Sequence, residues 1–181
     1  MKRYEYRLAG SGGQGLILAG IILAEAAGVH GGFYAVQTQS YGPESRGGAS
    51  RAEVILSDQV IDYPKVTRPG VVLCLTEEAC RRYAGDLADN GLLVVDEGVD
   101  QSLLPLAGSI RIVRLPLLRT AREELGREIV ANIVALGAIV GLTKTVTPEA
   151  VEKALVDRVP KGTTELNQQA FAHGLKLAEG E

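Results

Sequence analysis

Short apolar runs that are suited to β-strands recur along the first part of the chain. They are rich in Val, Ile, Leu and Tyr, and glycine, proline and asparagine residues punctuate the segments between them. We predict strands at residues 4–9, 33–36, 52–56, 71–75, 92–96 and 110–115, and a short edge or connecting segment at 60–64. The uninterrupted apolar run at 71–75 is typical of a strand that is buried on both faces of a parallel sheet.

Longer segments with helical character separate these runs and then finish the chain. We predict helices at residues 16–27, 77–88, 120–142, 148–159 and 164–177. Thr76 and Thr120 stand where N-caps are expected, and Pro148 stands at a helix start. Because strands alternate with helices before helices take over, the simplest packing is a single α/β domain over residues 1–181. It is Rossmann-like, with a doubly wound, mostly parallel sheet, helices on both faces and a helical C-terminus.

The second half of the helix predicted at 120–142 is apolar nearly all round. A helix of this kind is buried on most sides, inside a domain or between subunits. Gly137 and Gly141, one turn apart, allow another helix to come close. Asn132 is polar in this apolar stretch, so we expect a structural hydrogen bond for its amide.

A glycine-rich loop joins the first predicted strand to the first predicted helix. Its sequence matches the pattern G-x-G-x-x-G, in which glycines allow a tight turn, close approach of the backbone to a phosphate, and packing of helix on strand. A helix N-terminus also attracts anions. We therefore predict an anion or phosphate site formed by Gly10, Gly12, Gly13, Gln14 and Gly15. The alternative is that these glycines serve only the turn and the packing.

The dinucleotide-binding form of this motif requires an acidic residue about 20 positions further on, which holds the ribose hydroxyls. Here the strand at 33–36 leads into polar residues, and the next acidic residue is Glu44, beyond the Gly42-Pro43 turn. The sequence therefore disfavours NAD or FAD bound in the usual way.

Residues 37–50 form a polar stretch between two predicted strands. The stretch contains three glycines and one proline, but no Val, Ile or Leu. Long polar loops between buried strands commonly display functional groups, although an ordinary surface loop has the same composition. The candidate functional residues are Gln39, Ser40, Tyr41, Gly42, Pro43, Glu44 and Arg46.

Charge and apolar length exclude several classes of protein. The net charge is −3 without an evident basic face, which argues against a nucleic-acid partner. The longest apolar run, residues 129–142, is shorter than the roughly 20 residues of a membrane span, and the N-terminus lacks the apolar core of a signal peptide. We expect a soluble cytoplasmic protein that makes no contact with a membrane.

The metal-ligating residues are few and scattered. Cys74 and Cys80 are six apart and do not form a C-x-x-C pair, and His30 and His173 are distant in sequence. An iron–sulfur cluster or metal site in this chain alone is therefore not expected. Asp96 and Glu97 directly follow a predicted strand, where they either line a crevice or, more commonly for such residues, cap a loop.

The loop at residues 10–15 and the loop at 39–48 together resemble a known family. They are similar to the gamma subunits of the 2-oxoacid:ferredoxin (acceptor) oxidoreductases, most closely the 2-oxoglutarate type, with the pyruvate and ketoisovalerate types as relatives. The resemblance covers nearly the whole chain, including residues 49–54, 61–64 and 132–137. Ser45 stands where the family often has a small residue such as alanine.

This resemblance implies a multi-subunit enzyme that converts a 2-oxoacid and coenzyme A to an acyl-CoA and CO₂ and passes electrons to ferredoxin. Alpha, beta and ferredoxin-like delta subunits are the implied partners, and they would carry thiamine diphosphate, magnesium and the iron–sulfur clusters. The present chain would bind no cofactor alone and would be inactive alone. When isolated, it could associate with itself as a homodimer through surfaces meant for partners.

The two loops then have two open interpretations. The glycine loop could hold a phosphate of coenzyme A, and the 39–48 loop could reach into a partner's active site, where Arg46 would meet a carboxylate or phosphate. Alternatively, the 39–48 loop is only an interface element. A function from a different class, a free-standing Rossmann-like nucleotide-binding protein, is favoured by the strand–glycine loop–helix start and opposed by the missing acidic residue.

Overall fold

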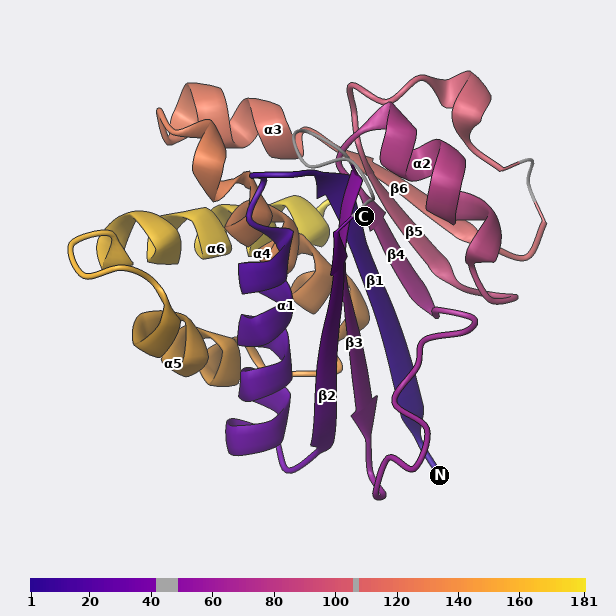
Figure 1. Cartoon of the computed structure of the whole chain (residues 1–181). Coiled ribbons are helices and arrows are strands. Elements are labelled where there is room, and N and C mark those ends of the chain that lie inside the picture. The colour runs from indigo at the N-terminus through magenta and orange to yellow at the C-terminus, as the bar shows by residue number, and fades with distance from the viewer. Residues whose placement is uncertain (42–48, 106–107) are drawn as a thin grey trace.

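A computed structural model describes residues 1–41, 49–105 and 108–181, and a six-stranded sheet forms its centre (Figure 1). The strands are β1 Arg3–Ser11, β2 Tyr34–Tyr41, β3 Ala49–Ser57, β4 Val71–Cys74, β5 Leu92–Asp96 and β6 Arg111–Leu115. Their order across the sheet is β2-β3-β1-β4-β5-β6. Only β3 runs against its neighbours β1 and β2, while β4 pairs in parallel with β1 and β5, and β6 in parallel with β5. The sheet is therefore mostly parallel, as predicted.

Helices cover both faces of this sheet (Figure 1). They are α1 Leu16–Glu25, α2 Glu77–Tyr83, α3 Leu117–Arg119, α4 Ala131–Thr143, α5 Pro148–Arg158 and α6 Thr164–Glu179. The main hydrophobic core lies between the sheet and α1, α4, α5 and α6, and a smaller core lies under α2 on the opposite face. Along β1, Tyr6 and Leu8 enter the first core and Ala9 enters the second. The predicted α/β fold with a doubly covered sheet and a helical C-terminus is confirmed.

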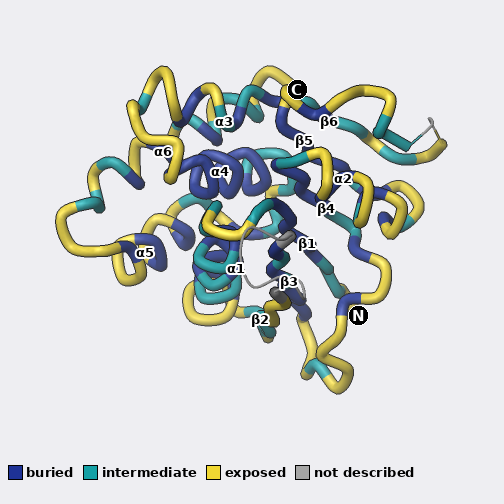
Figure 2. Tube along the Cα trace, turned by 45° about the horizontal axis from the view of Figure 1, so that its top comes forward, coloured by how far each residue is buried: buried dark blue, intermediate teal, exposed yellow. Residues whose placement is uncertain are grey.

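The helix α4 is the centre of the larger core. All residues from Ala131 to Val140 are buried, and the helix appears as a dark blue coil in Figure 2. It crosses α6 where Gly137 meets Gly174, because a methyl group at Gly137 would lie 3.0 Å from the Cα of Gly174. The prediction of a buried helix that uses glycine for close contact is confirmed for Gly137. Among the described residues, no helix is both long and apolar enough to span a bilayer.

Two predicted strand boundaries were wrong. The strand predicted at 33–36 continues to Tyr41, and β3 begins at Ala49, so residues 37–41 and 49–50 belong to a hairpin rather than to a loop. The polar composition of 37–41 was misleading because β2 is an edge strand, where side chains can face solvent. Residues 60–64 are not a strand; instead, the guanidinium of Arg3 donates a hydrogen bond to the carbonyl of Tyr63 at 2.9 Å.

The single helix predicted at 120–142 is interrupted. Helical structure begins earlier, at Leu117, and continues as a wide turn over Thr120–Glu124. Gly126 then takes a left-handed conformation with φ 68°, and a short 3₁₀ turn precedes α4. Thr120 is not an N-cap, because its N–H donates to the carbonyl of Pro116 at 2.8 Å within this helical segment. The predicted helix at 77–88 likewise ends sooner, with α2 passing into a 3₁₀ turn at Ala84–Asp86.

Candidate functional site

The glycine turn lies at the carboxyl end of β1 and leads directly into α1. Gly10 and Ser11 end the strand, while Gly13 and Gly15 take left-handed conformations with φ 89° and 72°. The side chain of Gln14 closes the turn, since its Oε1 accepts a hydrogen bond from the backbone N–H of Ser11 at 2.8 Å. Glycine is favoured at both left-handed positions because a Cβ would be strained there.

Two of the glycines are required for packing. A methyl group at Gly10 would collide with the Gln14 side chain, and one at Gly15 would lie 2.6 Å from Nδ2 of Asn132. That nitrogen donates a hydrogen bond to the carbonyl of Gly15 at 2.8 Å, so α4 holds the start of α1 in place. The structural hydrogen bond predicted for Asn132 is confirmed. For Gly10 and Gly15 the structure thus supplies a packing reason, whatever else they do.

The remaining glycines leave open space at the start of α1. Gly12 and Gly13 are exposed, and a Cβ added to Gly13 would meet no atom within 4 Å. The first turn of α1 contains no acidic residue, and no side chain caps its N-terminus among the described residues. Unpaired N–H groups and the positive end of the helix dipole therefore face this space, which is suitable for an anion.

The two motifs that are far apart in sequence meet at this end of the sheet. Ser50 of β3 pairs with Gly10 on one side and with Tyr41 of β2 on the other. The Ser50 hydroxyl donates a hydrogen bond to the carbonyl of Ser11 at 3.2 Å, which ties the start of β3 to the glycine turn. The end of β2 and the start of β3 therefore lie beside the turn. Gly42, Pro43, Glu44 and Arg46 themselves lie outside the described residues.

Three candidate residues lie on β2, namely Gln39, Ser40 and Tyr41, and of these Gln39 and Ser40 point to opposite faces of the sheet. Gln39 stands opposite Ala52, which belongs to the core on the α1 side, and Ser40 stands opposite Arg51. Since opposed residues of antiparallel strands share a face and successive residues alternate, Gln39 and Ser40 do not line one common pocket. Both side chains are exposed. Only one of them can therefore contribute to a site on either face.

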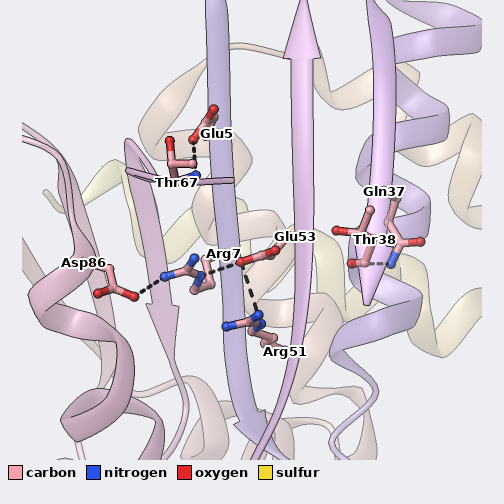
Figure 3. A network of polar contacts seen from close by, with 8 residues as sticks. All are labelled: Glu5, Arg7, Gln37, Thr38, Arg51, Glu53, Thr67 and Asp86. Carbon is pink, nitrogen blue, oxygen red and sulfur yellow. Dashed lines mark hydrogen bonds and ion pairs between the residues drawn. The ribbon is translucent and has the colours of Figure 1, made fainter. Parts of the chain in front are cut away.

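A buried polar cluster lies on the face with Ser40, and sequence reasoning missed it (Figure 3). Arg7 is 4% exposed and lies between two carboxylates, with Nε 2.7 Å from Glu53 and Nη1 2.5 Å from Asp86. Arg51 lies on the other side of Glu53, with Nε at 3.8 Å. Both guanidinium groups lie over the ring of Tyr83, at 5.4 and 5.5 Å from its centroid. The signal was available in the sequence, because Arg7 and Glu53 are charged residues next to the apolar parts of their strands.

This cluster fastens α2 and the following 3₁₀ turn to β1 and β3. Arg7 takes up both carboxylates at short distance, so Arg51 is the less compensated cation. A buried ion pair loses much of its favourable energy to desolvation, but removal of one partner leaves an uncompensated charge. The cluster therefore fixes the relative position of the strands that end at the glycine turn.

The other titratable candidates have structural roles. Both carboxylate oxygens of Asp96 are used, since Oδ1 accepts from Gly98 N–H and Oδ2 from Leu118 N–H, each at 2.9 Å. Asp96 thus caps a loop and the helical segment that follows, rather than lining a crevice. Cys74 and Cys80 are buried, and the hydrogen bond between their thiols, followed by burial, raises the pKa of Cys74. In the described part of the chain, no group of three His, Cys, Asp or Glu side chains is placed to hold a metal.

Comparison with known proteins identifies the family. The family model described as pyruvate ferredoxin/flavodoxin oxidoreductase matches residues 5–177, and the chain belongs to this family. It is 48% identical over 177 residues to the 2-oxoglutarate synthase subunit KorC of Methanocaldococcus jannaschii, covering 98% of this chain and 95% of that one.

Solved structures agree. The gamma subunit of a keto/oxoacid ferredoxin oxidoreductase from Geobacter sulfurreducens superposes with a TM-score of 0.90 at 50% identity, over 99% of this chain and 98% of that one. A 2-oxoglutarate:ferredoxin oxidoreductase from Magnetococcus marinus, solved with 2-oxoglutarate, coenzyme A and succinyl-CoA bound, shares the fold with a TM-score of 0.88 at 24% identity. The match covers 100% of this chain and 32% of that chain, which is longer.

Proposed function

We propose that this member of the pyruvate ferredoxin/flavodoxin oxidoreductase family is the gamma subunit of a cytoplasmic 2-oxoglutarate:ferredoxin oxidoreductase. Identity of 48% to a 2-oxoglutarate synthase subunit over nearly the full length of both chains supports this assignment. The complex would convert 2-oxoglutarate and coenzyme A to succinyl-CoA and CO₂, and two electrons would pass to ferredoxin.

The chemistry of bond cleavage belongs to partner subunits in this proposal. Alpha, beta and ferredoxin-like delta subunits would carry thiamine diphosphate with magnesium, for decarboxylation, and iron–sulfur clusters, for electron transfer. The described residues of the present chain contain no ligand set suited to a metal ion. Its own contribution is therefore binding, orientation and exclusion of water.

The observation that carries this role is the open space at Gly13, next to the exposed Gly12. Backbone N–H groups at the start of α1 face it, and no acidic side chain in the first turn of α1 opposes an anion there. We assign this space to a phosphate group of coenzyme A. β2 ends and β3 begins next to it, so that residues 39–48 would bring Arg46 toward the same ligand or toward the carboxylate of the oxoacid.

The experiment compares glycine variants in the complete complex. Gly12→Asp places a carboxylate beside the proposed anion site, and Gly85→Asp is the control, because Gly85 is exposed like Gly12 and a Cβ there meets no atom within 4 Å. We expect Gly12→Asp to raise the KM for coenzyme A by about tenfold or more, while the control leaves it unchanged. Arg46→Ala tests the hairpin, and we expect it to raise the KM for coenzyme A or for 2-oxoglutarate.

Each result separates the interpretations. An assembled Gly12→Asp complex with an unchanged KM for coenzyme A would show that the glycines serve only the turn and the packing. An Arg46→Ala complex with unchanged kinetics would favour the hairpin as an interface element. A wild-type complex that lacks coenzyme-A-dependent oxidation of 2-oxoglutarate would contradict the proposed function itself.

A further inference from the structure

The outward side of α1 is apolar. The helix sequence Leu16–Glu25 contains a single charged residue, Glu25, and its buried side is formed by Leu16, Ala19, Gly20, Ile22 and Leu23. On the other side, Ile17, Ile21 and Ala24 are only half-buried. A helix at the surface of a globular protein normally has polar residues on its solvent side. The composition of α1 is therefore that of a helix with a second apolar contact.

A groove continues this apolar side toward β2. Its volume is about 570 Å³, and it lies between α1, the following π-helical turn Ala26–His30 and β2. Residues that line it include Ile21, Ala24, Val29, Phe33, Tyr34 and Ala35. Val29 is 70% exposed and Tyr34 is 52% exposed, which is unusual for large apolar side chains beside a groove.

The adjacent edge of the sheet is unprotected. In the described part of the chain β2 pairs only with β3, and its sequence Tyr34–Tyr41 contains no charged residue, glycine or proline. The opposite edge strand, β6, carries Arg111 and Arg114 and is followed by Pro116. Charges and prolines are the usual means by which proteins prevent pairing at a sheet edge. One edge of this sheet has them and the other does not.

We propose that the α1–β2 face, defined by Ile21, Ala24, Val29, Phe33, Tyr34 and the outer edge of β2, binds a partner subunit of the same oxidoreductase. An extended segment of that subunit would pair with β2 and place an apolar side chain in the groove. The occupant is inferred from the Magnetococcus marinus enzyme, where the fold of this chain shares one longer polypeptide with other segments and makes up about a third of it. The subunit that corresponds to the rest of that polypeptide is the partner we assign to this face.

The direction of β2 supports this assignment. The strand runs from Tyr34 at the groove to Tyr41, which pairs with Ser50 beside the glycine turn. Its eight residues span about 25 Å. A subunit bound along this edge would therefore extend from the groove to the proposed coenzyme A site. The inference rests on the proposed function, since it names the partner of that same site.

The test is reconstitution of the complex from the separately purified gamma chain and the remaining subunits. The variant Val29→Glu/Tyr34→Glu places two charges on the α1–β2 face at exposed positions. The control Ile129→Glu places a charge at an apolar residue that is 59% exposed and outside this face. Circular dichroism and the thermal midpoint of each gamma chain establish that the substitutions leave the fold intact.

We expect the double variant to raise the gamma concentration needed for half-maximal activity by about tenfold or more, with no change for Ile129→Glu. Wild-type reconstitution with an unaffected double variant would overturn the inference alone. A double variant that abolishes a homodimer of the gamma chain in light scattering, but reconstitutes normally, would assign the face to a second copy and also overturn it. Failure of the wild-type chain to bind these subunits would overturn the proposed function together with the inference.

Discussion

The helices α1 and α4 have nearly the same chemistry but very different surroundings. Both consist almost entirely of aliphatic residues and glycine, and neither has a polar face. In α4, all residues from Ala131 to Val140 are buried. In α1, one side is buried and the other is half-open, as the alternation of dark blue and teal along the helix shows in Figure 2.

The difference shows how many of the apolar residues of each helix are buried by contacts within this chain. The apolar residues of α4 are accounted for by α6, by α1 and by the sheet, which together surround it. On the outer side of α1, Ile17 and Ala24 pack only partly against the core, and Ile21 lines the open groove. An apolar helix in a sequence therefore predicts that the helix is buried in the functional assembly. Only the structure shows which of its sides are buried within the isolated chain.

The largest expected effect comes from the crossing of α4 and α6. In Gly137→Val, the added side chain would collide with the carbonyl of Phe171 and crowd the backbone of Gly174. Because both obstacles are backbone atoms, the helices must separate, and we expect a loss of unfolding free energy of about 3 kcal/mol or more. Urea denaturation followed by circular dichroism measures this loss. Gly85→Val is the control, since a Cβ there meets no atom within 4 Å; equal midpoints for the two variants would contradict the packing argument.

One substitution made in both helices tests the comparison directly. Ile139 in α4 is fully buried, so Ile139→Gln both removes apolar contact and buries an amide, and we expect a loss of about 3–5 kcal/mol. Ile21 on the half-open side of α1 lines the groove, and Ile21→Gln should cost the isolated chain under about 1 kcal/mol. Chemical denaturation of the two variants gives both values. Similar losses would mean that the outer side of α1 is already satisfied within the chain.

Asn132 connects the two helices, and its removal should have an intermediate effect. In Asn132→Ala the hydrogen bond to the Gly15 carbonyl is lost, but that carbonyl still accepts from the Ala19 N–H at 3.2 Å. The Oδ1 of Asn132 also accepts from the buried Ile133 N–H at 2.9 Å, and this bond is lost as well. We therefore expect a loss of about 1–3 kcal/mol. The glycine turn should also be held less firmly. Thermal unfolding measures the loss of stability. A moderate rise in the KM for coenzyme A in the complete complex would show that the glycine turn is held less firmly. A rise in KM without any loss of stability would argue that Asn132 contacts the ligand itself.

The fold was accessible from the sequence because its core strands are apolar and its helices carry start signals. The run at 71–75 led to β4, and Thr147 followed by Pro148 marked the start of α5, where the Thr147 hydroxyl accepts from the Ala150 N–H at 3.3 Å. The second part of the edge strand β2, residues 37–41, was misread as a loop, because exposure on a sheet edge removes the apolar pattern that identifies a strand. The polar composition of this segment concealed the fact that it forms a strand.

The candidate site was accessible only in part. The strand–glycine turn–helix arrangement follows from local glycine chemistry, so Gly10 to Gly15 could be placed from the sequence. That Ser50 brings the β2–β3 hairpin to the turn depends on the pairing of β1 with β3, which is a contact between distant segments. The antiparallel direction of β3 and the Arg7 cluster also depend on contacts between segments that are distant in sequence. Short-range patterns carry no information about such pairings.

The smallest expected effect concerns Glu25, which is the only charge on α1. Arg158 of α5 makes an ion pair with it; the arginine side chain is 51% exposed and that of Glu25 is 14% exposed. Solvent at the arginine screens the pair, and glutamine keeps the size and hydrogen-bonding capacity of the glutamate. Glu25→Gln should therefore lower the unfolding free energy by about 1 kcal/mol or less, and the difference from wild type should shrink as salt is added. Urea titrations at low and high ionic strength measure this difference. A small, salt-sensitive effect would show that apolar packing, rather than the ion pair, holds α1 against the sheet and thereby sets the orientation of its open side. A large, salt-independent loss would mean instead that α5 holds α1 by charge, and the apolar outer side would then lose its value as a sign of a missing partner.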